Sequence, residues 1–351
     1  ESSRRRAEAA QSKDYDITFR RLVTRLSDLN EPRCRPSLNG LVLYDDRSMH
    51  VNTIAEHLNS FSEHSRHRIS YAVATGDARC DVDLSVVDLI VIHYSVRVSI
   101  EDHLSPDWVD ALRSFGGYKV LFAQDEYDTT ETTRRWIERL GVHLVFTCVP
   151  TPYIQEVYPS DRFPRVAFHP TLTGYVPARF ETDAPRKPLR ERPVMIGYRG
   201  RPLPFWYGAL GQEKIEIGRR MKAICAARGV EADIEWDDAH RIYGEDWYGF
   251  IENCRAMIGS ESGANVFDDT GAIRRAIERA QAANPDLAFD EAYERFLKPH
   301  EGRVRMNQIS PKIFEAIAMR TALILFEGDY SGVIEPNVHY IPLKKDFSNI
   351  D

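Results

Sequence analysis

Short apolar runs alternate with longer amphipathic segments between about residue 40 and residue 150. The runs are rich in β-branched residues and predict buried strands, whereas the longer segments carry apolar residues at helical spacing and predict helices. The predicted strands are Leu41 to Tyr44, Ile69 to Ala74, Leu89 to His93, Lys119 to Gln124 and Leu144 to Val149, and the predicted helices lie near His50 to Phe61, Pro106 to Phe115 and Thr130 to Leu140. This alternation is typical of a parallel sheet that helices cover on both faces.

A second series of the same kind follows a charged segment with three prolines, residues 181–193, which has no apolar periodicity and is predicted to be a linker. The strands predicted for this series are Val194 to Tyr198, Ala232 to Glu235, Ala256 to Gly259 and Ala322 to Phe326, with helices at Gly211 to Arg228, Asp246 to Asn253 and Pro311 to Met319. Residues 268–303 are rich in Ala, Arg and Glu without a strand pattern, which favours a helical insertion.

The predicted fold class is therefore α/β, with two Rossmann-like, doubly wound domains that face each other across a cleft. A chain of 351 residues with 43% hydrophobic residues exceeds what one core comfortably covers. We expect an N-terminal helix and linker at 1–36, a first domain at 37–180, the linker at 181–193 and a second domain at 194–351. Ligands of such sheets bind at the carboxyl ends of the strands.

The composition of the chain argues against several classes of binding partner and of protein. A net charge of −7 argues against nucleic acid, because binding to phosphate backbones needs a basic excess. The five cysteines are scattered without a CxxC pair or a zinc-type spacing, which fits a reducing cytoplasm. No apolar run approaches the roughly 20 residues of a membrane span, and the N-terminal residues carry no signal-peptide core.

The helix that begins after Ser310 is the richest candidate for ligand chemistry. Ser310 suits the N-cap and Pro311 the first helical position. The free N–H groups of such a helix end attract a diphosphate, and Lys312 adds a mobile cation. Glu315, one turn further, can accept hydrogen bonds from ribose hydroxyls. The alternative is an amphipathic core helix with an ordinary cap.

The segment from Ser310 to Ala322, followed by an apolar strand, resembles the C-terminal motif of group-1 GT-B glycosyltransferases. The resemblance implies that Glu315 holds the ribose of a nucleotide-sugar donor and that the turn at Ser310 meets its diphosphate. The family usually has a second glutamate where Asn307 stands in this chain. It also implies a second domain that binds the donor and a first domain that binds the acceptor.

A second resemblance lies at the start of the predicted second domain, in Val194 to Arg201 and the later Lys214. Glycosyltransferases of this type place an arginine after the first strand of this domain and a lysine further on. The matching residues are Arg199 or Arg201, with Lys214. Fixed cations stabilise a leaving diphosphate without a metal, so we expect no metal and no cofactor apart from the donor itself.

Three titratable residues stand at the ends of predicted strands in the first domain: His93, Asp125 and Glu126. Strand ends of a parallel sheet share one edge, so these groups are expected to face the cleft and to activate or align an acceptor hydroxyl. Glu261, in a segment of small residues after a strand, is a candidate contact to the sugar or the acceptor. The alternatives are helix caps and a plain loop.

One short motif suggests a metal instead. Asp81-Val82-Asp83 spells the DxD with which another class of transferase holds Mn²⁺. It precedes an apolar run, whereas that chemistry requires it at the end of a strand, so we expect it to bind no metal.

The resemblance implies transfer of a sugar from a nucleotide donor to a glycan or glycolipid, in the biosynthesis of a bacterial surface polysaccharide, with retention of anomeric configuration. The expected location is the cytoplasm, with peripheral association at the inner face of the membrane left open. Inversion would require a base, which would be Glu126, Asp125 or His93. Two alternatives remain: a sugar-nucleotide epimerase of the same shape, and a non-catalytic protein that binds nucleotide sugars.

Overall fold

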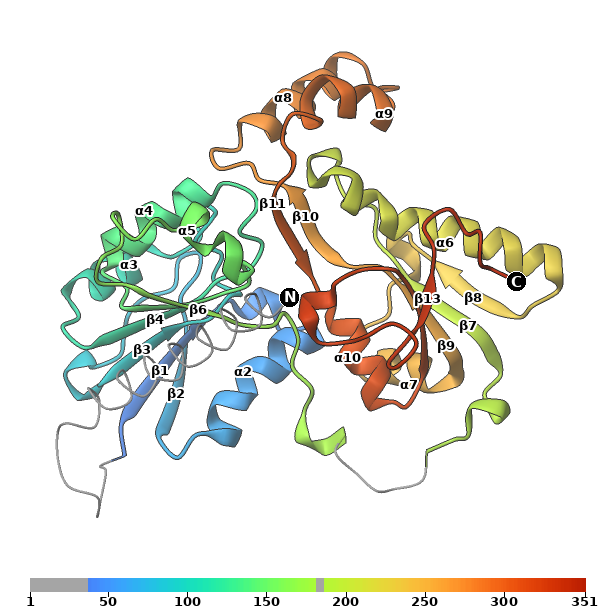
Figure 1. Ribbon diagram of the computed structural model, residues 1–351. Helices are drawn as coiled ribbons and strands as arrows, with labels where there is room; N and C mark the ends of the chain where they lie inside the picture. The colour runs from blue at the N-terminus through green and yellow to red at the C-terminus, as the bar shows by residue number, and fades with distance from the viewer. Residues whose placement is uncertain (1–36, 181–185) are drawn as a thin grey trace, which may run out of the picture.

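The computed structural model describes residues 37–180 and 186–351, and it contains two parallel sheets (Figure 1). The predicted helix in 1–36 and residues 181–185 of the predicted linker lie outside the described residues. We call residues 37–180 the first unit and residues 186–351 the second unit. None of the described helices is long and apolar enough to span a membrane.

The sheet of the first unit has six parallel strands in the order β2-β1-β3-β4-β5-β6. Its strands are β1 (Asn39–Tyr44), β2 (Arg68–Val73), β3 (Leu89–Ile92), β4 (Tyr118–Phe122), β5 (Leu144–Thr147) and β6 (Ala167–Pro170). The reversal of strand order falls between β1 and β3, and ligands of doubly wound sheets bind beside such a reversal. All five predicted strands of this unit are confirmed, and β6 is an additional one.

Helices cover both faces of this sheet, as the strand–helix alternation predicts. On one face, Leu58 of α2 (Asn52–His64) packs with Val42 and Val91 of the strands. On the other, Trp108 and Ile137 pack with the strands from α3 (Pro106–Ser114) and α4 (Thr130–Leu140). The remaining helical segments of this unit are α5 (Ile154–Val157) and the short 3₁₀ turns η1 (Asp46–Ser48), η2 (Leu84–Val86), η3 (Thr151–Tyr153) and η4 (Ala178–Phe180).

The sheet of the second unit is parallel as well, in the order β13-β12-β9-β7-β8. Its strands are β7 (Val194–Arg199), β8 (Ala232–Glu235), β9 (Cys254–Gly259), β12 (Ala322–Phe326) and β13 (Ile341–Leu343). Its helices are α6 (Gly208–Arg228), α7 (Glu245–Asn253) and α10 (Pro311–Ala318), with 3₁₀ turns η5 (Leu189–Glu191), η6 (Phe205–Tyr207), η7 (Asp238–His240) and η9 (Tyr330–Gly332). The four predicted strands and three predicted helices are confirmed, and the reversal of strand order lies between β7 and β9.

The predicted helical insertion stands on an antiparallel ribbon of two strands, β10 (Ser262–Val266) and β11 (Glu301–Gln308). Between them lie α8 (Ala272–Ala283), α9 (Phe289–Ala292) and a π-helical turn, η8 (Tyr293–Leu297). The prediction that residues 268–303 hold no strand is therefore wrong at its end, where β11 begins. Alternate burial along Arg303 to Met306 is the period-two pattern of a strand with one buried face.

The ribbon joins the second unit to the first unit (Figure 1). Its residues Ala264, Val304 and Met306 belong to the apolar core of the first unit. Ion pairs flank this apolar contact, with 2.5 Å between Arg274 Nη1 and Asp128 Oδ2 and 2.6 Å between Arg134 Nη1 and Asp269 Oδ1. Several pairs of opposite charge and a shared core therefore hold the two units together on this side.

A smaller polar contact joins the units through α2 and α7. The Asn52 side chain donates a hydrogen bond to the Gly244 carbonyl and accepts one from the Gly244 N–H, each 2.8 Å long. The Tyr248 hydroxyl donates to Glu56 at 2.7 Å, and Arg179 pairs with the same carboxylate at 2.8 Å. These bonds bring the first turn of α2 beside the loop that precedes α7.

Candidate functional site

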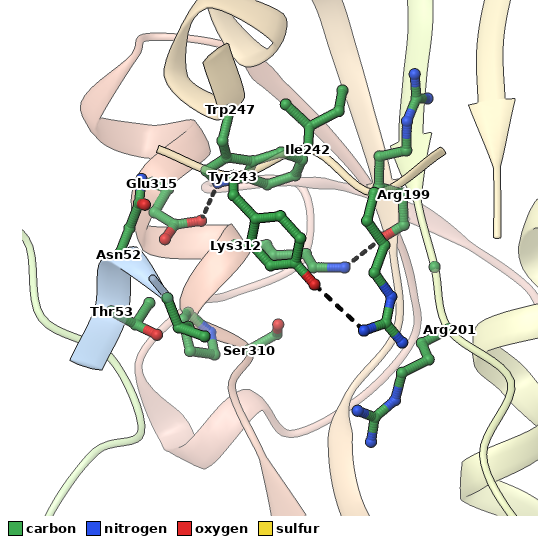
Figure 2. Close-up of a pocket in the computed structure, with 14 residues that line it drawn as sticks. Asn52, Thr53, Arg199, Arg201, Ile242, Tyr243, Trp247, Ser310, Lys312 and Glu315 are labelled. Carbon is green, nitrogen blue, oxygen red and sulfur yellow. Dashed lines mark hydrogen bonds between the residues drawn. The ribbon is translucent and has the colours of Figure 1, made fainter. Parts of the chain in front are cut away.

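A pocket of about 270 Å³ opens at the N-terminus of α10, and we call it the α10 pocket. Most of its wall comes from the second unit, at the carboxyl end of β7 and the starts of α7 and α10, and the start of α2 completes it from the first unit. Figure 2 shows Glu315 and Trp247 on one side and Arg199 and Arg201 on the other, with Lys312 and Tyr243 between them. The pocket thus lies beside the reversal of strand order in the second sheet.

The first turn of α10 lies at the wall of this pocket. Ser310 is in an extended backbone conformation at the N-cap, and Pro311 follows at the first helical position, as the sequence predicts. The Ser310 hydroxyl makes no capping hydrogen bond. Ser310, Pro311 and Lys312 all line the pocket, so the positive end of the helix is directed toward it.

Two lysines carry positive charge into the same region. Lys312 Nζ donates a hydrogen bond to the Arg199 carbonyl and lies 5.8 Å from the ring centres of both Tyr198 and Trp247. Lys214 Nζ donates to Ser262 Oγ at 2.8 Å. Burial, and after it the charge of neighbouring cations, lowers the pKa of each lysine to about 8. A bound anion would relieve both effects.

Glu315 lies on the opposite wall. Its Oε2 accepts a 2.7 Å hydrogen bond from Trp247 Nε1, which fixes the carboxyl at the pocket. Burial raises the pKa of Glu315 to about 6, against the opposing effects of Trp247 and Lys312. The other carboxylate oxygen, Oε1, makes no hydrogen bond with a described residue and can accept one from a ligand hydroxyl.

The two arginines predicted as alternatives differ in their contacts. Arg199 is paired with Asp233 at 2.8 Å, donates to the His240 carbonyl at 3.0 Å and stacks 4.3 Å from the Phe250 ring centre. Arg201 is exposed and makes no side-chain hydrogen bond or ion pair with another residue of 37–180 or 186–351. The geometry therefore favours Arg201 as the arginine that can bind a ligand.

The position of Glu126 requires a correction. We expected this carboxylate at the edge facing the second unit, but its side chain is turned into the first unit and the residue is only 3% exposed. It accepts hydrogen bonds from Thr147 Oγ1, Tyr158 Oη and the Cys148 N–H, at 2.6, 2.6 and 2.8 Å. Burial raises the pKa of Glu126 against the effect of these donors. Its observed role is to connect β4 and β5.

His93 is likewise enclosed by protein, with an exposed fraction of 0%, contrary to the expectation that it faces a cleft. Its Nε2 lies 2.9 Å from His57 Nδ1, and its Nδ1 lies 2.9 Å from Ser95 Oγ. Burial and then His57 lower the pKa of His93 to about 3, so the ring is neutral at ordinary pH. A neighbouring cavity of about 10 Å³ is lined by His57 rather than by His93.

Asp125 is the one member of the predicted acceptor edge that is exposed. Its backbone is in the left-handed region with φ of 57°, which is uncommon for a residue other than glycine. Its Oδ1 accepts a 2.8 Å hydrogen bond from the Tyr127 hydroxyl. Asp125 lines a second cavity, of about 320 Å³, together with Arg97, Arg201 and Tyr207, and we call this the Arg97 cavity.

Glu261 does not contact either space, which corrects the expectation of a ligand contact. It is 4% exposed, and its carboxylate accepts from Asn307 Nδ2 at 2.6 Å and from the N–H groups of Asp329 and Tyr330 at 3.1 and 2.9 Å. These bonds attach the loop after β12 to the ribbon. Asn307, at the position of the family's second glutamate, thus serves to hold Glu261.

Neither the DxD motif nor the group of potential metal ligands found among the described residues lines the α10 pocket or the Arg97 cavity. Asp83 of the DxD accepts a 3.0 Å hydrogen bond from the Ser85 N–H, as a cap of η2. Within the described residues, the potential ligand atoms of Glu235, Asp237 and His240 lie within 4.8 Å of one another. Their carboxylates already have partners, since Lys222 pairs with Glu235 at 2.6 Å and His240 bonds Asp237 at 2.7 Å.

Several residues of the two spaces were not predicted from the sequence. In the α10 pocket these are Asn52, Thr53, Arg241, Tyr243 and Trp247, and in the Arg97 cavity they are Arg97 and Tyr207. No motif surrounds them. The one available signal is position, because Asn52 and Arg97 follow strands β1 and β3 on either side of the reversal of strand order.

Comparison with known proteins gives limited further information. No protein-family model matches the chain, and no curated protein matches it in sequence. Among solved structures, an α-glucosyltransferase in complex with UDP and a 13-mer DNA has a TM-score of 0.42 and 12% identity, covering 76% of this chain and 96% of its own. The glycotransferase of kitacinnamycin has a TM-score of 0.30 and 10% identity, covering 82% and 94%. Both neighbours are glycosyltransferases, but similarity at this level does not establish a family.

Proposed function

We propose that this protein is a metal-independent glycosyltransferase with a GT-B arrangement, in which the second unit binds a nucleotide-sugar donor and the first unit binds the acceptor. The observation that carries the proposal is the convergence of Lys214, Lys312 and Arg201 near the N-terminus of α10. Lys312 and Arg201 both line the α10 pocket, and after burial the charges of both lower the pKa of Lys214. Such a cluster is complementary to a diphosphate.

The donor is assigned to the α10 pocket in two parts. Its diphosphate lies at Ser310, between Lys312 and Arg201, and its ribose hydroxyls donate to Glu315. The charge of the buried Lys214, which does not line the pocket, adds to that of these two cations. Tyr243 and Trp247 supply apolar surface for the remainder of the nucleotide. Asn52 and Thr53 complete the pocket from the first unit, so a bound donor contacts both units.

In the transfer step, an acceptor hydroxyl oxygen forms a bond to the anomeric carbon while the bond from that carbon to the diphosphate oxygen breaks. The negative charge that develops on the leaving diphosphate is stabilised by the cations already in place. We propose retention of configuration, in which the hydroxyl proton passes to the leaving phosphate and Asp125 orients the acceptor. In the inverting alternative, Asp125 takes the proton as the base, because Glu126 and His93 are enclosed by protein.

The biological setting of the proposal rests on the sequence resemblance. The acceptor is a glycan or glycolipid, the product belongs to a bacterial surface polysaccharide, and the reaction takes place in the cytoplasm or at the inner face of its membrane. A fold of two parallel sheets is compatible with each of these assignments.

The experiment that tests the function uses the full chain with a panel of UDP-, GDP-, CMP- and dTDP-sugars. A bound donor raises the melting temperature by mass action, and the stabilising donor is then incubated with glycan and glycolipid acceptors and analysed by mass spectrometry. Transfer that persists in EDTA supports the proposal, whereas EDTA-sensitive activity restored by Mn²⁺ contradicts its metal-free part. Conversion of the donor without acceptor identifies an epimerase, and binding without turnover identifies a non-catalytic protein.

A further inference from the structure

The Arg97 cavity adjoins the α10 pocket, because Arg201 lines both. Its first-unit wall consists of the segments that follow β3 and β4, including Arg97 and Asp125, and its second-unit wall includes Tyr207. Its volume of about 320 Å³ falls within the range of about 300–1,000 Å³ typical of small-molecule pockets. A molecule held there lies beside the proposed position of the donor diphosphate.

Two arginines of this cavity are not engaged by hydrogen bonds or ion pairs of their side chains within the described residues. Neither Arg97 nor Arg201 forms a side-chain hydrogen bond or ion pair with any residue in the described ranges 37–180 and 186–351. Asp128, a carboxylate near Arg97, is paired with Arg274 at 2.5 Å. A guanidinium stays protonated at any ordinary pH and presents a planar fork of donors suited to phosphate and carboxylate oxygens.

The charged groups of the cavity, Asp125, Arg97 and Arg201, line it together with Tyr207. Burial raises the pKa of Tyr207, its hydrogen bond with Tyr127 lowers it, Asp125 raises it, and Arg201 and Arg97 lower it. The Tyr207 ring packs against Tyr127, with 5.1 Å between ring centres, and Tyr127 donates to Asp125. Of the residues that line the cavity, two carry a guanidinium group and one, Asp125, carries a carboxylate.

We propose that the Arg97 cavity binds an acceptor that carries an anionic group, a phosphate or a carboxylate, close to the hydroxyl that receives the sugar. Arg97 and Arg201 bind the anion, and the free oxygen of Asp125 accepts the hydrogen bond of the reacting hydroxyl. The inference rests on the proposed transferase function and narrows its acceptor class. Arg97 is the residue that selects the acceptor, since Arg201 also lines the α10 pocket and Arg97 does not.

The test separates the cavity from the pocket by filling the pocket first. The full chain is saturated with the nucleoside diphosphate of the stabilising donor and titrated calorimetrically with inorganic phosphate, glucose 6-phosphate, glucuronate and glucose. We expect the anionic probes to bind at least about tenfold more tightly than glucose, as charged hydrogen bonds imply. A hexosyl phosphate with a dodecyl chain, measured in detergent, distinguishes a lipid-linked acceptor from a soluble one.

Variants then assign the effect to Arg97. Arg97→Ala should weaken anionic probes by about 10–100-fold and leave nucleotide affinity within about twofold, whereas Arg97→Lys should restore part of the loss. Arg79→Ala removes an arginine of the same unit whose side chain is 78% exposed. This control should change neither the affinity for the anionic probes nor the affinity for the nucleotide. Equal binding of glucose and glucose 6-phosphate overturns the inference while leaving the transferase intact. Loss of nucleotide affinity in Arg97→Ala overturns it too, and a wild-type chain that binds no nucleotide defeats both proposals.

Discussion

The α10 pocket and the Arg97 cavity both gather positive charge between the two units and share Arg201, but their other cations differ. The pocket is lined by Lys312, whose charge also acts on the buried Lys214, and burial and neighbouring cations lower the pKa of each lysine to about 8. The cavity relies on Arg97 and Arg201, whose guanidinium groups stay charged. Binding in the pocket should therefore depend on pH in the neutral to alkaline range, whereas binding of a carboxylate such as glucuronate in the cavity should not, because neither its charge nor that of the arginines changes there.

The largest expected effect comes from removing the cations of the pocket. Lys214→Ala and Lys312→Ala should each lower turnover by on the order of 100-fold, because each removes charge stabilisation that grows as the diphosphate leaves. Steady-state kinetics at saturating donor measures this. Lys222→Ala, a lysine on the same helix as Lys214 that pairs with Glu235, is the matched control and should retain full activity. Equal losses in all three variants would show that the pocket has no special role.

The next effect concerns Glu315 and the donor ribose. Glu315→Gln retains an acceptor for Trp247 but loses the charge, and nucleotide affinity should fall by about tenfold, the lower end of what a charged hydrogen bond contributes. A 2′-deoxy nucleotide provides the matched ligand. If Glu315 contacts that hydroxyl, the deoxy nucleotide should bind the wild type and the variant with similar affinity, whereas additive losses would place the ribose elsewhere.

The residues of α10 illustrate how far the sequence predicts the site. Lys312 and Glu315 stand three residues apart on one helix, a spacing that places them on the same side, and Ser310 caps the start of that helix. The structure has all three together in the α10 pocket. The parallel sheets were predictable for the same reason, because each strand and helix is a local pattern. The directions of the side chains at the strand ends of the first unit, those of His93, Asp125 and Glu126, were not predictable in this way.

At that edge, the position of a residue after a strand does not determine where its side chain points. The left-handed backbone at Asp125 leaves this residue exposed, while the next one, Glu126, is turned inward to Thr147 and Tyr158. The conformation depends on long-range contacts that no local pattern encodes. Arg97 was missed for a related reason, since its significance lies in Arg201 and Tyr207 of the other unit.

The pH dependence sharpens the comparison between pocket and cavity. Lysines with a pKa near 8 are protonated below that pH, so nucleoside diphosphate affinity should be highest between about pH 6 and 8 and fall by about tenfold by pH 9. Below pH 6 the protonation of Glu315 should weaken binding again. Calorimetry across this range, with proton uptake measured above pH 8, provides the test.

A double variant in which arginine replaces Lys214 and Lys312 tests whether these lysines cause the pH dependence of nucleoside diphosphate affinity. Because arginine remains charged, the double variant Lys214→Arg/Lys312→Arg should lose the decline above pH 8 while keeping the decline below pH 6. An alkaline decline that persists in the double variant would assign the titration to another group, and the contrast with the cavity would no longer hold.

The smallest expected effect tests the wall that the first unit contributes to the pocket. Asn52→Ala removes the two 2.8 Å hydrogen bonds with Gly244, and each such bond contributes about 0.5–1.5 kcal/mol. Part of this loss is recovered because water can reach the exposed backbone groups of Gly244, so nucleotide affinity should fall only several-fold. Asn59 is an exposed residue of the same helix, and the control variant Asn59→Ala should leave nucleotide affinity unchanged. Asn52 lines the α10 pocket and not the Arg97 cavity, so phosphate binding in nucleotide-saturated protein should be unaffected. A loss of equal size in both spaces would mean that the contact between α2 and α7 sets the relative position of the units as a whole rather than closing one pocket.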